Sequence, residues 1–245
     1  MIRRTLGIFL SLGLLGAVLV SCAALSAPEE ASAPIKAIPV ATQADVSENE
    51  TGEEPQESEA LSLPAAGTVT LQIVQDESEA RFELDEILNG SPKRVVGTTN
   101  QVAGEILINI DDPSAVQVGT IQVNARTLST DNSFRNRAIA NSILETGTYE
   151  FVTFKPTEIV GFPESPVLGE TISFQIIGDL TVRDVTNEVV FDVTATPVSD
   201  SRLEASASAT IMRGDYGLTI PSVAQVADVS EEVILTLDFV AVPVS

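Results

Sequence analysis

The feature that most limits how this chain can fold is the alternation of apolar and polar residues in short segments between residues 102 and 239. A period of two places successive side chains on opposite faces of a β-strand. The apolar positions of this alternation include Val102, Ile106, Ile108 and Ile110, then Ile172, Phe174 and Ile176, then Val189, Phe191 and Val193, and finally Val233, Leu235, Leu237 and Phe239. Turn-forming residues separate these segments, so the pattern predicts an all-β sandwich or barrel.

One segment departs from this alternation, between residues 131 and 144. It opens with residue types that cap helices, and it places Ile139 and Ile143 four residues apart on what would be one helical face. We expect the one helix of consequence here.

The first 21 residues have the layout of an export signal. A short basic start is followed by an almost entirely apolar run over residues 6–20, and that run is about 15 residues long. A membrane-spanning helix needs roughly 20 apolar residues, whereas this length fits the apolar core of a signal peptide. Residues 19–22, Leu-Val-Ser-Cys, resemble the bacterial lipobox, in which the cysteine thiol receives a diacylglycerol.

The sequence therefore predicts an exported lipoprotein, with residues 1–21 as the signal peptide and Cys22 as the lipid-attachment site. Several acyl chains hold a protein on a membrane where a single chain would not. The expected location is the cell envelope, on the extracytoplasmic side of a membrane. The alternatives are a transmembrane anchor or a chance cysteine. Cys22 is the only cysteine in the chain, so no intramolecular disulfide can form.

Residues 22–66 have the composition of a linker. After the cysteine they contain mainly Ala, Ser, Pro and Glu, with nine acidic residues, one basic residue and no aromatic residue. Such a stretch buries too little apolar surface to offset the entropy lost on ordering, so we expect a disordered tether. Residues 67–245 then form one domain.

Charge and composition exclude several functions. The chain carries 35 acidic and 13 basic residues, a net charge of −22, which disfavours nucleic acid and anionic membrane surfaces as partners. With no histidine and no other cysteine, the usual general base, nucleophile and transition-metal ligands are missing. We expect no enzyme activity, no metal and no cofactor, and the sequence leaves the oligomeric state open. The acidic pairs at 111–112 and 231–232 lack the spacing of a calcium loop.

From about residue 68 to its end, the chain resembles the YceI-like family of bacterial lipid-binding proteins. The resemblance rests on six stretches in the same order, at residues 78–82, 96–106, 124–135, 149–154, 177–186 and 212–218. The most diagnostic is the run Gly178, Asp179, Leu180, Thr181, Val182, Arg183, Asp184, Val185, Thr186. The domain lacks the Trp and His that many relatives carry in their opening strands.

The resemblance implies an eight-stranded, lipocalin-like antiparallel barrel with one short helix, enclosing an elongated apolar channel. Family members bind polyisoprenoids or other long-chain amphiphiles in such a channel. The residues expected to contact the ligand are Phe82, Ile106, Ile108, Val123, Phe134, Arg135, Ile139, Phe154, Phe174, Ile176, Phe191, Ala205, Ala207, Ala209 and Leu237.

Independent support for a cavity comes from Ala205, Ala207 and Ala209, which alternate where a strand would ordinarily carry larger residues. The alternative is that a bulky neighbour such as Phe191 fills that space. Arg135 and Arg137 are candidates for an anionic ligand head, because a guanidinium pairs bidentately with phosphate or carboxylate. Either arginine could instead pair with acids of this acidic chain.

The sequence thus predicts a membrane-anchored protein whose barrel carries or sequesters a long-chain apolar ligand, a polyisoprenoid or another lipid. The alternative is a closed β-barrel that recognises an envelope protein and holds no lipid.

Overall fold

The computed structural model describes residues 27–40 and 67–244. The predicted signal peptide, the lipid-attachment site Cys22 and the rest of the predicted linker lie outside the described residues. In the described part of the chain, no helix has the length and apolar character needed to cross a membrane.

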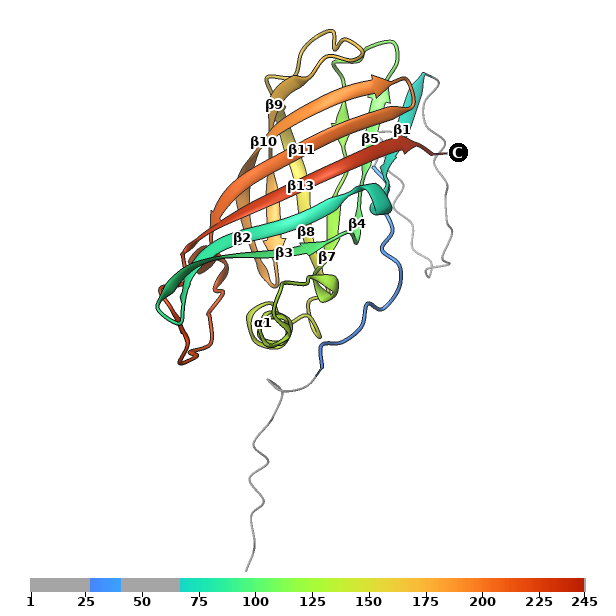
Figure 1. The fold of residues 1–245 in the computed structure, drawn as a ribbon. Coiled ribbons are helices and arrows are strands. Elements are labelled where there is room, and N and C mark those ends of the chain that lie inside the picture. Colours follow the sequence, from blue (N-terminus) through green and yellow to red (C-terminus); the bar gives the residue numbers. More distant parts are fainter. Residues whose placement is uncertain (1–26, 41–66, 245) are drawn as a thin grey trace, which may run out of the picture.

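The domain is built almost entirely from antiparallel strands (Figure 1). The strands are β1 (Thr68–Ile73), β2 (Glu79–Leu88), β3 (Ser91–Thr99), β4 (Val102–Ala103), β5 (Glu105–Asn109), β6 (Gln117–Val118), β7 (Ile121–Asn124), β8 (Phe151–Val160), β9 (Ile172–Val182), β10 (Val185–Ser199), β11 (Arg202–Met212), β12 (Val226–Ala227) and β13 (Glu232–Pro243). The helical elements are α1 (Ser133–Ala138), the π-helix η4 (Ile139–Ile143) and the 3₁₀ turns η2 (Gln75–Glu77), η3 (Ala125–Thr127) and η5 (Arg213–Tyr216).

All the strands belong to one curled sheet. The path through it runs β4-β7-β8-β9-β10-β11-β13-β1-β5-β6, and β2 joins it by pairing with β13, β3 and β12. Along one edge of β13 lie first β2, opposite residues 234–238, and then β1, opposite residues 241–243. The other edge pairs with β11 over its length.

The all-β prediction with one short helix is confirmed, but the predicted count of eight strands is not, because this path has ten. Two stretches of extended chain are each divided into two strands, which raises the number of strands. The turn η2 separates β1 from β2, and Gly104 separates β4 from β5. At Gly104 the chain changes partners, since β4 pairs with β7 whereas β5 pairs with β1. The Gly104 carbonyl accepts a hydrogen bond from the Ile73 N–H at 3.1 Å.

The predicted helix lies where the sequence places it, but in two parts. Asn132 caps α1, because its side-chain oxygen accepts hydrogen bonds from the backbone N–H groups of Phe134 at 2.9 Å and Arg135 at 3.1 Å. The π-helix η4 continues α1 and buries Ile139 and Ala140. This helical pair closes over one end of the curled sheet (Figure 1).

Part of the predicted linker lies against the domain instead of being disordered. This stretch, residues 27–40, is here called the strap, and it runs along the side of the sheet from the α1 end towards β5 (Figure 1). Ile35 is only 5% exposed. Its carbonyl accepts a hydrogen bond from the Gln75 side chain at 2.9 Å. At the α1 end, Glu29 pairs with Arg126 at 3.1 Å.

Glu150 is the main polar attachment of the strap. It accepts hydrogen bonds from the Ser32 hydroxyl at 2.7 Å and the Ser32 N–H at 2.9 Å. Burial raises the pKa of the Glu150 carboxyl, but these bonds, a bond from Asn124 and the charge of Arg126 together lower the pKa below its ordinary value. A depressed folded-state pKa stabilises the structure above the ordinary value of about 4.3, and this contribution is lost as the pH falls through the lower folded value. The contribution of Glu150 to holding the strap is therefore complete at neutral pH and is lost in acid.

We predict that Ile35→Ser detaches the strap. The substitution removes a buried apolar side chain, which should cost about 1–3 kcal/mol of the free energy that holds the strap. Hydrogen exchange of residues 27–40 should show the loss of protection. The matched control is Ile38→Ser, in the same segment, where the side chain is 42% exposed and the loss should be smaller. Equal protection in the two variants would contradict this account.

Candidate functional site

The interior of the curled sheet holds a cavity of about 730 Å³. It extends from the loop between β8 and β9, which contributes Phe162 and Leu168, to the helical end, which contributes Arg135 and Ile143. These two ends lie at opposite ends of the sheet (Figure 1). The volume is within the range of pockets that hold small molecules. The interior is thus not closed by packing.

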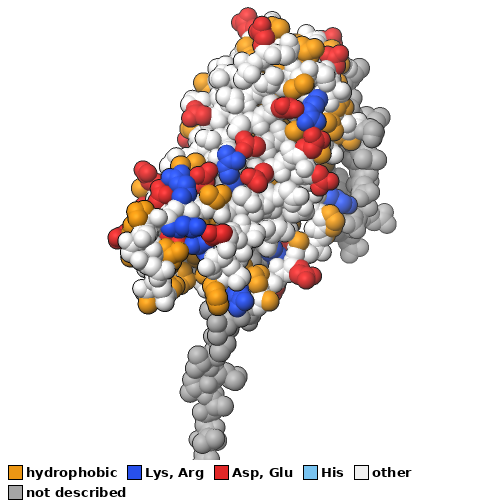
Figure 2. Space-filling view, in the orientation of Figure 1, with side chains coloured by type: hydrophobic (Ala, Val, Ile, Leu, Met, Phe, Trp, Pro, Cys, Tyr) orange, Lys and Arg blue, Asp and Glu red, His pale blue; other side chains and the backbone are white. Residues whose placement is uncertain are grey.

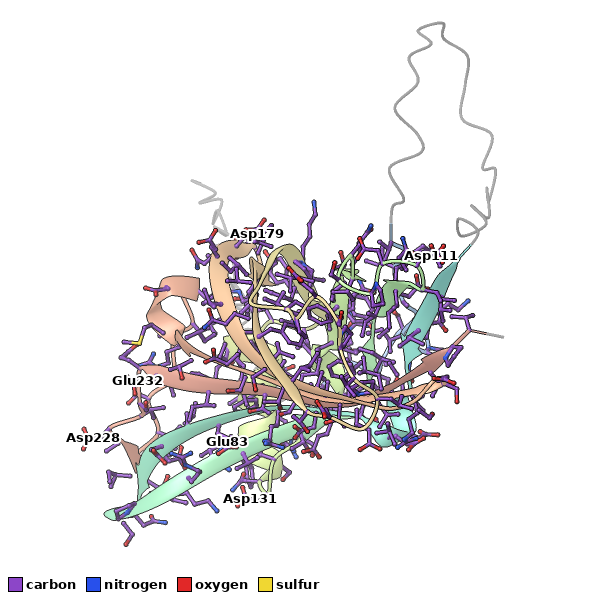
Figure 3. The ribbon with its side chains drawn as sticks, turned by 90° about the horizontal axis from the view of Figure 1, so that it is seen from above. Glu83, Asp111, Asp131, Asp179, Asp228 and Glu232 are labelled. Carbon is purple, nitrogen blue, oxygen red and sulfur yellow. The ribbon has the colours of Figure 1, made fainter. Side chains whose placement is uncertain are left out.

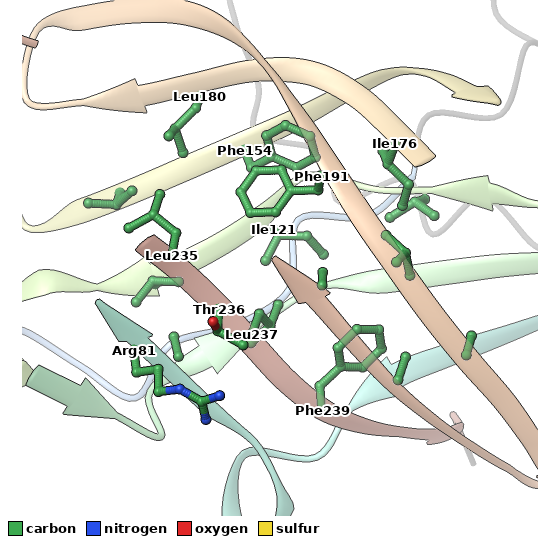
Figure 4. Close-up of a pocket in the computed structure, with 18 of the residues that line it drawn as sticks. Arg81, Ile121, Phe154, Ile176, Leu180, Phe191, Leu235, Thr236, Leu237 and Phe239 are labelled. Carbon is green, nitrogen blue, oxygen red and sulfur yellow. The ribbon is translucent and has the colours of Figure 1, made fainter. Parts of the chain in front are cut away.

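Most residues that the sequence predicts for the site line this cavity. They are Phe82, Ile106, Ile108, Val123, Arg135, Ile139, Phe154, Phe174, Ile176, Phe191, Ala205, Ala207 and Leu237. The close-up shows the side chains of Phe154 from β8, Phe191 from β10, and Leu237 and Phe239 from β13 pointing into a shared space (Figure 4). The alternation of each strand places them there, because every second residue faces the interior. Whether each contacts a ligand stays a prediction.

Phe134 and Ala209 do not line the cavity. Phe134 is 73% exposed, and the guanidinium of Arg137 lies 5.4 Å from the centre of its ring. Residues three or four apart share a helical face, so Arg135 and Ile139 meet the cavity while Phe134 and Arg137 lie on another face. Ala209 lies in a buried cluster with Leu180, Val182, Val189, Ile211, Tyr216 and Val233. Leu180, Val182, Ile211 and Val233 of this cluster line the cavity themselves, whereas Ala209 is packed among its neighbours.

Ala205 and Ala207 leave space that their neighbours do not fill. Ala207 lies opposite Val193 on β10 and opposite Leu237 on β13, and all three line the cavity. Phe174, Phe191 and Phe239 also line the cavity. Bulky neighbours therefore border this space without closing it, which favours the cavity over the filled alternative.

Two ring pairs shape the wall. Phe154 and Phe191 meet edge to face with ring centres 4.8 Å apart, and Phe162 and Phe174 do so at 5.0 Å. Such pairs stabilise by about 0.5–1.5 kcal/mol beyond their buried area. They hold large side chains against one another at the wall.

Two glycines make room for rings that line the cavity. A methyl group at Gly97 would lie 2.2 Å from a ring carbon of Phe82, its partner across β2 and β3. A methyl group at Gly178 would lie 2.5 Å from the Lys155 carbonyl oxygen and 2.7 Å from the Phe154 ring. Each ring thus packs against the backbone of a glycine, in space that a side chain would otherwise fill. As a result, less of the ring projects into the cavity.

The helical end of the cavity carries a buried ion pair that the sequence analysis missed in part. Arg135 reaches from α1 to Glu86 of β2, with 2.7 Å between nitrogen and oxygen, and Glu86 is 5% exposed. Arg135 was expected at the site, with pairing to acids as the alternative to a ligand head, and the structure shows that pairing. Glu86 could have been found from the alternation of Ala80, Phe82 and Leu84, which it continues on the same face.

The acidic residues of the outer surface do not converge. Figure 3 shows Glu83, Asp111, Asp131, Asp179, Asp228 and Glu232 at separate places on the domain. Many acids pair with arginines, as in Arg81–Asp238 at 2.7 Å and Arg94–Asp85 at 2.8 Å. Acidic and basic side chains are accordingly interspersed on the face in Figure 2. Within residues 27–40 and 67–244, no group of three or more metal-ligating side chains is placed to hold a metal ion.

Comparison with known proteins assigns this domain. The YceI-like domain matches residues 71–241. Among solved structures, BcnA of Burkholderia cenocepacia is similar with a TM-score of 0.53 and 15% identity, over 69% of this chain and 98% of that one. A polyisoprenoid binding domain from Saccharophagus degradans, implicated in plant cell wall breakdown, has a TM-score of 0.56 and 14% identity, over 72% and 99%. At these identities the likeness establishes the fold. No curated protein matches the chain significantly.

Proposed function

The chain belongs to the YceI-like family, and from this premise we propose that its cavity binds a long-chain apolar ligand, a polyisoprenoid or another lipid, for carriage or sequestration without catalysis. The observation that carries the proposal is the cavity of about 730 Å³, whose wall is formed mainly by apolar side chains of β1, β2, β5, β7 to β11 and β13. The solved polyisoprenoid binding domain with the same fold supports this class of ligand.

The physical basis is burial of the ligand's hydrocarbon chain. Each methylene moved from water into such a cavity gains about 0.8 kcal/mol, so roughly ten buried carbons gain about 8 kcal/mol before the entropic costs of binding. The elongated shape suits a chain better than a compact molecule, because the cavity extends between the two ends of the sheet.

We predict that Ala207→Phe weakens binding of geranylgeraniol, a twenty-carbon prenol, at least about tenfold, because the new ring occupies the cavity. Binding can be measured with radiolabelled geranylgeraniol on the full chain. The control is Ser208→Phe, on the same strand, since Ser208 is exposed and does not line the cavity. If folded Ala207→Phe protein bound the prenol as tightly as the control, an internal site would be ruled out.

We further propose that Cys22 is lipidated and anchors the protein on the extracytoplasmic side of a membrane. The signal-like residues 1–21 and the lipobox resemblance support this. The strap begins at residue 27, and the five residues from Cys22 reach at most about 18 Å. Glu29 of the strap contacts Arg126, whose guanidinium also donates to the carbonyls of Thr146 and Gly147 just after η4. The anchor would therefore hold the helical end of the sheet towards the membrane.

Replacing the attachment residue tests the anchor. Cells that express the protein and are fed radioactive palmitate should label the native chain and not Cys22→Ser, and only the native chain should be found in the membrane fraction. No second cysteine can take the label, because Cys22 is the only one. Label retained in Cys22→Ser would exclude a lipid anchor at this cysteine.

A further inference from the structure

The cavity is lined by one ion pair whose acid is almost fully buried. Glu86 faces the interior from β2, and Arg135 meets it from α1 at 2.7 Å. The other charged residues that border the cavity are Arg81, Asp200, Arg202 and Arg213, all more exposed than Glu86. Three of them pair with acids outside the cavity lining, Arg81 with Asp238, Arg202 with Glu77 and Arg213 with Glu231. The Glu86–Arg135 pair is therefore the charged group that a ligand deep in the helical end would meet.

Ion pairs at this end join four charged groups whose charges balance. Arg135 also pairs with Asp131 at 2.6 Å, and Asp131 pairs with Lys93 at 2.6 Å. Two carboxylates thus face one guanidinium and one ammonium group. The Arg135 guanidinium pairs with two carboxylates, so its positive charge is already neutralised.

An anionic ligand head would disturb this balance. A phosphate brought next to Arg135 would also lie next to the Glu86 carboxylate, and repulsion between like charges is strong where water is excluded. An uncharged polar group meets no such repulsion. A hydroxyl can donate a hydrogen bond to the carboxylate, and a carbonyl or hydroxyl oxygen can accept one from a guanidinium N–H.

From this geometry we infer that the Glu86–Arg135 pair makes the cavity selective for long-chain molecules whose polar end is uncharged and hydrogen-bonding, an alcohol, a phenol or a carbonyl, over the same chains ending in phosphate. The inference rests on the proposed function and goes beyond it by naming the chemistry of the ligand's polar end. It also replaces the expectation that Arg135 receives an anionic head, because the acid that neutralises Arg135 faces the same space.

The test compares two probes with the same hydrocarbon chain, geranylgeraniol and geranylgeranyl phosphate. It uses the delipidated full chain carrying Cys22→Ser, without detergent. This protein should bind the alcohol at least about tenfold more tightly than the phosphate. Glu86→Gln removes the competing charge and keeps the size of the side chain, so it should strengthen phosphate binding about tenfold and change alcohol binding less than about threefold.

Glu83→Gln is the matched control. It removes the same charge from the same strand, but Glu83 does not line the cavity. Of its two partners, Arg94 does not line the cavity either, and Arg81, which borders it, keeps its pair with Asp238. Its preference between the two probes should equal that of the parent protein. A parent protein that binds the phosphate as tightly as the alcohol would overturn the inference, and this comparison needs no substitution in the cavity. The inference would also be overturned if Glu86→Gln changed the ratio of the affinities for alcohol and phosphate no more than Glu83→Gln does. Failure to bind either probe would refute the proposed function itself.

Discussion

Hydrogen bonds along both edges of β13 hold the curled sheet together, and the hollow interior depends on them. One edge pairs with β11 over ten register positions, and the other pairs first with β2 and then with β1. When neighbouring strands satisfy the backbone in this way, the wall keeps its shape without side chains that fill the space it encloses. A cavity of about 730 Å³ is therefore compatible with a stable domain. Buried clusters compensate, one around Leu180 and Tyr216 and smaller ones around Leu71 and Ile73.

The alternation in the sequence was enough to predict most of the wall. Where a strand is regular, as in β9 and β11, the period of two fixes which residues face inwards, so Phe174, Ile176 and Ala207 could be assigned without a structure. It could not say which inward-facing side chains reach the surface of the cavity, because that depends on how their neighbours pack. Ala209 continues the series of Ala205 and Ala207, yet it is packed among its neighbours, although Ile211 beyond it lines the cavity again.

The remaining differences arise from contacts between residues far apart in the chain. The composition of residues 22–66 predicts disorder, but an average over the segment conceals the few residues that find partners, such as Ile35 and Ser32. Their partners Gln75 and Glu150 become neighbours only when the sheet has formed. The Glu86–Arg135 pair joins β2 to α1 across 49 residues for the same reason. The sequence pattern of the short helix predicts a helical segment, but it does not predict which face meets the sheet. In the structure the face with Arg135 lines the cavity and Phe134 is exposed.

The central claim is that the interior of this domain is a binding site for a long apolar chain. Its most direct test is lipid mass spectrometry of an organic extract from the full chain, carrying Cys22→Ser and purified without detergent. The account predicts one long-chain species in stoichiometric amount, released only when the protein is unfolded. An extract without any long-chain species, from a folded protein that also fails to take up a long-chain alcohol saturably, would contradict it.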